Sequence, residues 1–209
     1  MKNSFICNKG CYILSYALLI LITLLFINAP AQTPDTIRIF ELSFKTPDKD
    51  WKVRINPNKS REVTLYKEKV SILTTVGSSV ISVYKDSLSN EACTKSEKEI
   101  ADSILHNEIK LLDKDFKNGK FEFSDTKIQK KNKFGKDFYT LSFQTKVISQ
   151  SVFNGDNVLF LYFPKDFKER HVFYGFMVND YVAESAVLTD NNTEIINPVL
   201  ESFKIEGLK

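Results

Sequence analysis

Alternation of apolar and polar residues at every second position dominates the chain from Ile37 onward. Val53 and Ile55, for example, alternate with the charged residues between and beside them until Asn56-Pro57-Asn58. Successive side chains of an extended strand point to opposite faces, so this alternation predicts half-buried β-strands. The turn-forming residues predict where each strand ends. A similar stretch over 37–44 has a break near Phe40, which predicts two short strands.

Two later segments, 158–163 and 172–178, are apolar on both alternating sets of positions. A strand with this pattern must be covered on both faces, which predicts a central position in the sheet. The segment between them, 164–171, is short and polar. We therefore expect the two strands to pair as an antiparallel hairpin.

Helical spacing is clearest behind Ser96. The segment Ser96–Glu99 has the serine and glutamate of a capping box, in which each side chain accepts the other residue's backbone N–H. The helix is expected to run to about Asp115 and to pack one apolar stripe on the sheet. That stripe comprises Ile100, Ile104, Leu105, Leu111 and Leu112. A shorter final helix is predicted from about Thr193, with Pro198 limiting its regularity.

The N-terminal region has the pattern of an export signal. Lys2 and Lys9 precede residues 12–27, which carry no charge, and Ala29 and Ala31 then form an A-x-A cleavage pattern. This order predicts a signal peptide over 1–31 and a single exported domain, periplasmic or secreted, over 32–209. Residues 12–31 are also long enough to remain as a membrane anchor with the domain outside. In that alternative the anchor is the only membrane contact.

Cysteine use fits this organisation. Cleavage would remove Cys7 and Cys11 and leave Cys93 alone, so no disulfide is expected within the mature domain. The sequons at Asn58 and Asn191 are relevant only in a eukaryotic source.

Net charge excludes one class of partner. The whole chain has 29 basic and 26 acidic residues, and losing Lys2 and Lys9 leaves a nearly neutral domain. Nucleic acid is therefore not an expected partner. One local excess of lysines is interpreted as a solvated strand edge and turn that discourages pairing between sheets, with binding to an anionic lipid or polymer as the alternative. It consists of Lys127, Lys130, Lys131, Lys133 and Lys136, interrupted by Phe134.

The sequence contains no recognisable catalytic signature. Apart from the leader it has two histidines, His106 and His171, far apart in the chain and without a nucleophile motif. The S-x-x-K string at Ser82 lies in a predicted strand, where serine and lysine would point to opposite faces. No spacing typical of zinc ligands is present. We expect no enzyme, no metal and no cofactor.

Aromatic residues gather in the second half of the chain. One interpretation is a large aromatic core, and the other is a sheet face that forms a cavity or docking surface for an apolar ligand, peptide or protein. In the second interpretation Tyr162, Tyr174 and Phe176 are expected to line the site. Phe167 and His171 would then lie at its mouth.

The order of elements resembles the PsbP-like family. The residues that carry the resemblance are Trp51–Ile55, the strand Val80–Tyr84 leading into Lys95–Asp102, and the closing Ser202–Ile205. The resemblance implies an α+β fold in which an antiparallel β-sheet is flanked by helices, an α/β/α sandwich. The segment 121–163 is long and rich in phenylalanine for that family, so extra strands are expected in the sheet.

The resemblance and the export signal together predict a functional class. They imply a non-catalytic accessory or binding module that docks on another envelope or secreted protein. The alternative is a carrier or sensor of a small apolar ligand or lipid.

Overall fold

The computed structural model describes residues 36–39, 41–55, 62–71, 74–116, 121–148, 152–184 and 192–206. All of them belong to one compact unit, Thr33–Lys209. The predicted signal peptide over 1–31, with its anchor alternative over 12–31, lies outside the described residues, as do Asn58 and Asn191. None of the described helices is both long and apolar enough to cross a membrane.

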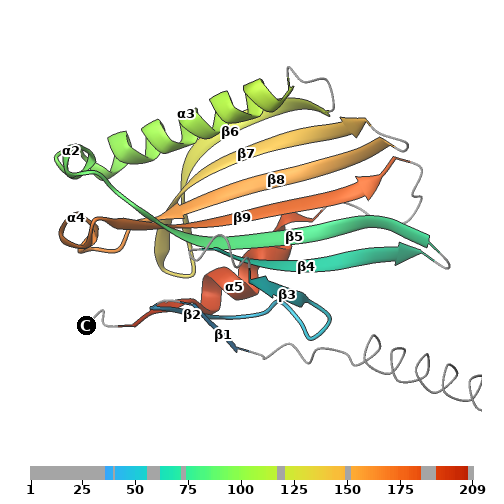
Figure 1. The fold of residues 1–209 in the computed structure, drawn as a ribbon, viewed down its shortest axis with the longest axis horizontal. Coiled ribbons are helices and arrows are strands. Elements are labelled where there is room, and N and C mark those ends of the chain that lie inside the picture. Colours follow the sequence, from blue (N-terminus) through green and yellow to red (C-terminus); the bar gives the residue numbers. More distant parts are fainter. Residues whose placement is uncertain are drawn as a thin grey trace, which may run out of the picture. The chain divides into compact units, whose positions relative to one another are not determined.

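A seven-stranded antiparallel sheet forms the centre of the unit (Figure 1). In spatial order its strands are β3 (Lys52–Ile55), β4 (Glu62–Ser71), β5 (Thr74–Ser87), β9 (Val172–Ala183), β8 (Val152–Tyr162), β7 (Lys136–Ile148) and β6 (Phe121–Lys133). The two strands with apolar residues on both faces, β8 and β9, are central and pair as an antiparallel hairpin, which confirms the prediction. Their connection includes a short helix, α4 (Phe167–Arg170), where a polar loop was expected.

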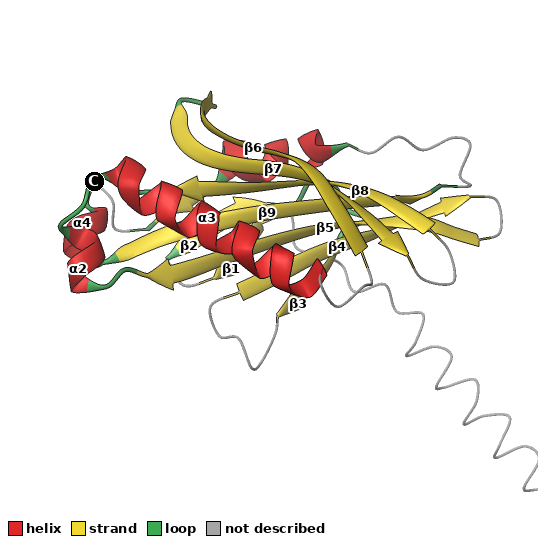
Figure 2. Cartoon of the chain, turned by 90° about the horizontal axis from the view of Figure 1, so that it is seen from above, coloured by secondary structure: helices red, strands yellow, loops and turns green. Residues whose placement is uncertain are grey.

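Helix α3 (Glu97–Phe116) packs on one face of this sheet, against β6 and β7 (Figures 1 and 2). It follows the short α2 (Asn90–Cys93). The capping box is present: Ser96 Oγ accepts the Glu99 N–H at 3.3 Å, and Glu99 Oε2 accepts the Ser96 N–H at 2.8 Å. The predicted stripe is wrong at Leu111, which is 54% exposed. At roughly 100° per residue, Leu111 lies about 120° around the helix from the buried Leu105.

The opposite face is covered by a mixed layer. A three-stranded antiparallel sheet, in the order β1 (Thr36–Ile39), β2 (Leu42–Lys45) and β10 (Lys204–Ile205), lies beside the helical segments η1 (Thr193–Ile196) and α5 (Asn197–Ser202). The predicted break near Phe40 separates β1 from β2. The layers therefore agree with an antiparallel sheet that has helices on both faces. They differ from a simple α/β/α sandwich because part of this second layer is itself a sheet.

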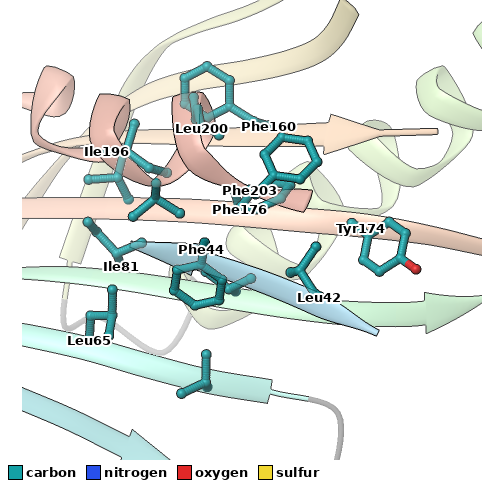
Figure 3. Packing of buried hydrophobic residues seen from close by; sticks show 14 of the residues in the cluster. Leu42, Phe44, Leu65, Ile81, Phe160, Tyr174, Phe176, Ile196, Leu200 and Phe203 are labelled. Carbon is teal, nitrogen blue, oxygen red and sulfur yellow. The ribbon is translucent and has the colours of Figure 1, made fainter. Parts of the chain in front are cut away.

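Each face of the main sheet has its own core. In the core facing α5, the ring of Phe138 contacts those of Phe160, Phe176 and Phe203, and Phe176 also contacts Phe203. Figure 3 labels the last three of these phenylalanines. The core facing α3 contains Leu105, Leu141, Leu161 and their neighbours. The aromatic residues of the second half of the chain are thus shared between two filled cores.

Candidate docking surface

The residues predicted as a binding site fall on both sides of the sheet. Tyr162, Tyr174 and Phe176 belong to the core facing α5, whereas Phe167 belongs to the core facing α3. Tyr174 and Phe176 are each 0% exposed. His171 is half-buried and ends α4 in the left-handed conformation, with φ 54°. The structure therefore brings three of the five together in a packed core, and a role of these residues in binding stays a prediction.

Tyr174 joins a polar cluster that the sequence did not indicate. Its hydroxyl donates to Glu41 Oε1 at 2.5 Å, and the same oxygen accepts from Lys85 Nζ at 2.7 Å and Arg170 Nη2 at 3.2 Å. Burial alone would raise the pKa of Glu41, but the hydrogen bonds from Lys85 and Tyr174 outweigh it and lower that pKa. Glu41 therefore stays charged and fastens the start of β2 to the main sheet.

The hairpin of β6 and β7 presents the most exposed aromatic side chain that the structure describes. Lys133 pairs with Lys136, leaving Phe134 and Gly135 as the two turn residues. Both have positive φ, 55° and 73°, as in a type I′ turn. This conformation suits Asn and Gly, whereas a residue such as Phe is destabilised in it by about 1–2 kcal/mol. Phe134 is nevertheless 45% exposed at the tip.

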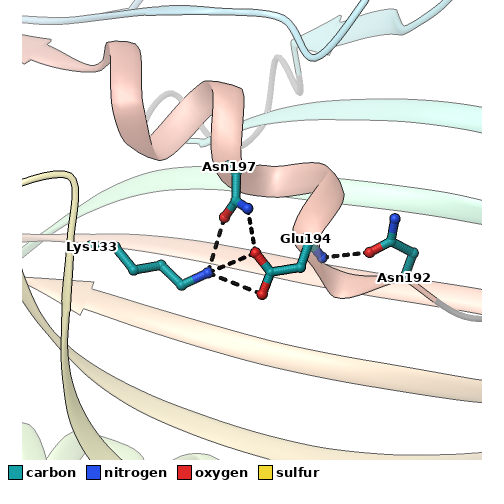
Figure 4. Close-up of polar contacts among 4 residues, drawn as sticks. All are labelled: Lys133, Asn192, Glu194 and Asn197. Atoms are coloured by element: carbon teal, nitrogen blue, oxygen red, sulfur yellow. Dashed lines mark hydrogen bonds and ion pairs between the residues drawn. The ribbon is translucent and has the colours of Figure 1, made fainter.

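Two lysines beside Phe134 fix the hairpin tip to the second layer. Lys133 Nζ contacts Glu194 Oε2 at 2.9 Å and Asn197 Oδ1 at 3.0 Å (Figure 4). Lys136 Nζ donates to the carbonyls of Leu200 at 3.0 Å and Glu201 at 3.1 Å, near the end of α5. A cation at this end of a helix satisfies carbonyls that have no partner within the helix.

The lysine run is therefore only partly the solvated edge that was predicted. β6 is an edge strand and Phe134 lies in a turn, as expected. Lys133 and Lys136 instead support η1 and α5, and the Nζ of Lys136 also lies 4.3 Å from the centre of the Phe203 ring. Hydrogen bonds from Lys133 and Asn197 lower the pKa of Glu194, so this support is charged at neutral pH.

The same contacts hold the hairpin tip that carries Phe134 against η1 and α5. Asn192 Oδ1 accepts the Glu194 N–H at 2.9 Å and so positions Glu194 toward Lys133. The sequence Asn132-Lys-Phe-Gly-Lys136 shows a turn, but contacts to residues about 60 positions away cannot be read from it.

Among the described residues, no three His, Cys, Asp or Glu side chains are grouped to hold a metal ion.

Comparison with known proteins gives a fold and no closer relationship. No family model matches the chain, and no curated protein matches it. Among solved structures it is similar to the solution structure of PsbP (CyanoP) from the cyanobacterium Synechocystis sp. PCC 6803. The TM-score is 0.50 at 13% sequence identity, over 84% of this chain and 95% of that one. The likeness supports a PsbP-like fold.

Proposed function

We propose that this chain is an exported, non-catalytic accessory module that docks on another envelope or secreted protein through the tip of the β6–β7 hairpin. The observation that carries the proposal is Phe134, an exposed aromatic side chain in an unfavourable backbone conformation on a hairpin tip held against η1 and α5. Aromatic side chains are enriched among the few residues that provide most of the binding energy of an interface.

The position of Phe134 is better explained by binding than by folding. Asn or Gly would form the same turn with less strain, and neither would expose a ring to water. Unfavourable backbone conformations concentrate at functional positions, where the surrounding structure holds them in place. The contacts of Lys133 and Lys136 provide that restraint here.

The class of function is supported by two further features. The A-x-A pattern behind residues 12–27 favours export, so the partner is expected in the envelope or outside the cell. The PsbP-like fold is consistent with a non-catalytic accessory module. Fold alone does not identify the partner.

The alternative, a carrier or sensor of a small apolar ligand or lipid, has one candidate location. A groove of about 460 Å³ lies beside α3 and is lined in part by Tyr84, Ile104 and Phe173. Burial raises the pKa of Glu108, which also lines this groove. The groove does not include any of the five residues predicted to bind a ligand.

A photo-cross-linking experiment tests the docking proposal. Benzoylphenylalanine replaces Phe134 in the full-length chain in its source cell, and the matched control places it at Leu111, an exposed apolar residue on α3. We expect one discrete protein adduct from position 134 and none from position 111. Equal adducts from both positions would overturn the proposal, and a lipid-sized adduct alone would favour the carrier.

A second variant separates docking from stability. Phe134→Asn is expected to raise the free energy of unfolding by about 1 kcal/mol, because asparagine tolerates positive φ. The same change should reduce the amount of the partner, identified by cross-linking, that copurifies with the chain. A variant that is more stable and still binds its partner fully would show that Phe134 is not the docking residue.

A further inference from the structure

The outward face of the three-stranded sheet gathers three cations around one hydroxyl. In the register of β1, β2 and β10, Ser43 lies directly between Arg38 on one side and Lys204 on the other. Lys45 follows two positions along β2, on the same face as Ser43. Directly opposed residues of antiparallel strands point to the same side. Arg38, Ser43, Lys45 and Lys204 therefore share one surface.

These side chains line a depression of about 560 Å³. Its other lining residues are Thr36, Phe44, Ser202, Ile205 and Glu206. Neighbouring strands lie about 4.8 Å apart, so Arg38 and Lys204 start about 10 Å apart across Ser43. Both side chains are long enough to bend toward the hydroxyl between them. The spacing therefore suits a small, multiply charged group seated over Ser43.

The charge of this depression is not compensated by the described part of the fold. Arg38, Lys45 and Lys204 are all exposed, and none forms an ion pair with another described residue. Among the described residues that line the depression, Glu206 alone has an acidic side chain. Three cations against one carboxylate leave the described lining net positive, which favours an anion as the occupant.

We propose that the depression binds an oxyanion of the phosphate or sulfate type, carried by a free ion or by the headgroup of a lipid. The planar guanidinium of Arg38 would bind two oxygens of the anion, and the ammonium groups of Lys45 and Lys204 would act as point charges. The Ser43 hydroxyl would donate to a further oxygen. The site does not include Phe134, so this proposal is independent of the docking proposal.

The test titrates the full-length chain, in a non-ionic detergent, with inorganic phosphate and with sulfate at constant ionic strength. Backbone amide NMR signals of Ser43, Lys45 and Lys204 are followed, with chloride as the reference anion. We expect saturable shifts of these signals with phosphate or sulfate and none with chloride. Shifts that follow ionic strength alone, or that are the same with all three anions, would overturn the proposal.

Charge variants identify the side chains involved. Arg38→Gln, Lys45→Gln and Lys204→Gln should each weaken binding about three- to fivefold, since each removes one exposed cation. Lys98→Gln on α3, on the other face of the main sheet, is the matched control and should not change it. Glu206→Gln should strengthen binding by removing the opposing carboxylate. Equal affinity in all five variants would overturn the proposal.

The source of the anion is distinguished by vesicles. Phosphatidylcholine vesicles with and without phosphatidic acid are mixed with the full-length chain and with Arg38→Gln. Vesicle binding that needs phosphatidic acid and is weakened by Arg38→Gln supports a lipid headgroup. Saturable phosphate shifts without such vesicle binding support a free ion. If neither phosphate, sulfate nor phosphatidic acid binds, the proposal is wrong.

Discussion

The two faces of the main sheet are covered in different ways. On one face α3 packs through residues close in sequence, such as Ile100, Ala101 and Leu105, and its cap is local as well. On the other face the covering layer combines residues 36–45 with residues 193–205, which lie near opposite ends of the described chain. A local helix can be positioned by one apolar stripe. A layer assembled from distant segments needs further contacts to fix where each segment lies.

Polar contacts supply that positioning on the face toward α5. Asp180 is 0% exposed and accepts from Lys69 Nζ at 2.7 Å and from the Asn192 N–H at 2.5 Å, with Ser79 Oγ as a third partner. It therefore joins β4, β5 and β9 to the start of η1. Glu41 and Lys133 make comparable connections for β2 and α5. Such contacts specify a position because a buried charge without its partner is strongly unfavourable.

The largest predicted effect compares one deletion in each core. Phe176→Ala should lower the free energy of unfolding by about 3–5 kcal/mol, because Phe176 contacts the rings of Phe138 and Phe203. Leu105→Ala on the α3 side should lower it by about 2–4 kcal/mol. Urea denaturation followed by fluorescence of Trp51, the single tryptophan, measures both. Val70→Ala, at a 66% exposed position, is the control and should stay within about 0.5 kcal/mol. A larger loss of unfolding free energy for Leu105→Ala than for Phe176→Ala would contradict this prediction.

The next largest predicted loss of stability comes from removing the buried carboxylate of Asp180. Asp180→Ala should lower the free energy of unfolding by about 3 kcal/mol, because it leaves the mostly buried Lys69 ammonium without its partner. Hydrogen exchange should accelerate at the Asn192 amide, which loses its acceptor. In a double-mutant cycle, adding Lys69→Ala should recover part of the loss. A loss below about 1 kcal/mol, with unchanged exchange at Asn192, would show that Asp180 does not position η1.

Glu41 is predicted to give a smaller, pH-dependent effect. Glu41→Gln should lower the free energy of unfolding by about 1–2 kcal/mol at pH 7, because the hydrogen bonds from Lys85 and Tyr174 lose their charged acceptor. The pKa of Glu41 is lowered in the folded state, so its stabilisation is present above the unfolded-state pKa and is lost as pH falls through the folded-state pKa. The free energies of unfolding of the native chain and of Glu41→Gln should therefore differ less at pH 3 than at pH 7, as measured by denaturation. The same difference in the free energy of unfolding at both pH values would show that the charge of Glu41 does not stabilise the fold.

The smallest effect belongs to the α3 face. Ser96→Ala should lower the free energy of unfolding by about 1 kcal/mol, through loss of the helix cap. Amide exchange should accelerate at Glu99, whose N–H the serine accepts, and remain unchanged at Asn192. Ser103→Ala, at an exposed interior position of α3, is the control and should cause no loss. Faster exchange at Asn192 would show that the two layers are more strongly coupled than their contacts indicate.

Local elements and their burial could be read from the sequence. The capping box at Ser96 predicted where α3 begins, since a cap uses only residues three positions apart. Apolar residues on both alternating sets predicted that β8 and β9 are central. The break near Phe40 predicted two strands. Helical spacing failed at Leu111, which is exposed, and the side chain of Leu112 lies outside the described residues.

The tertiary structure decided which distant segments meet. Glu41 lies 133 residues from Tyr174 in the sequence, and Lys133 lies 61 residues from Glu194. Hydrophobic periodicity relates only residues a few positions apart, so it does not predict contacts at such separations. The same holds for Arg38, Ser43 and Lys204, which become neighbours only because β10 pairs with β2. The sequence by itself determined local structure and polarity, because these depend on adjacent residues. The tertiary structure alone decided the charge clusters and the exposed position of Phe134, because they depend on strand pairing and packing between layers.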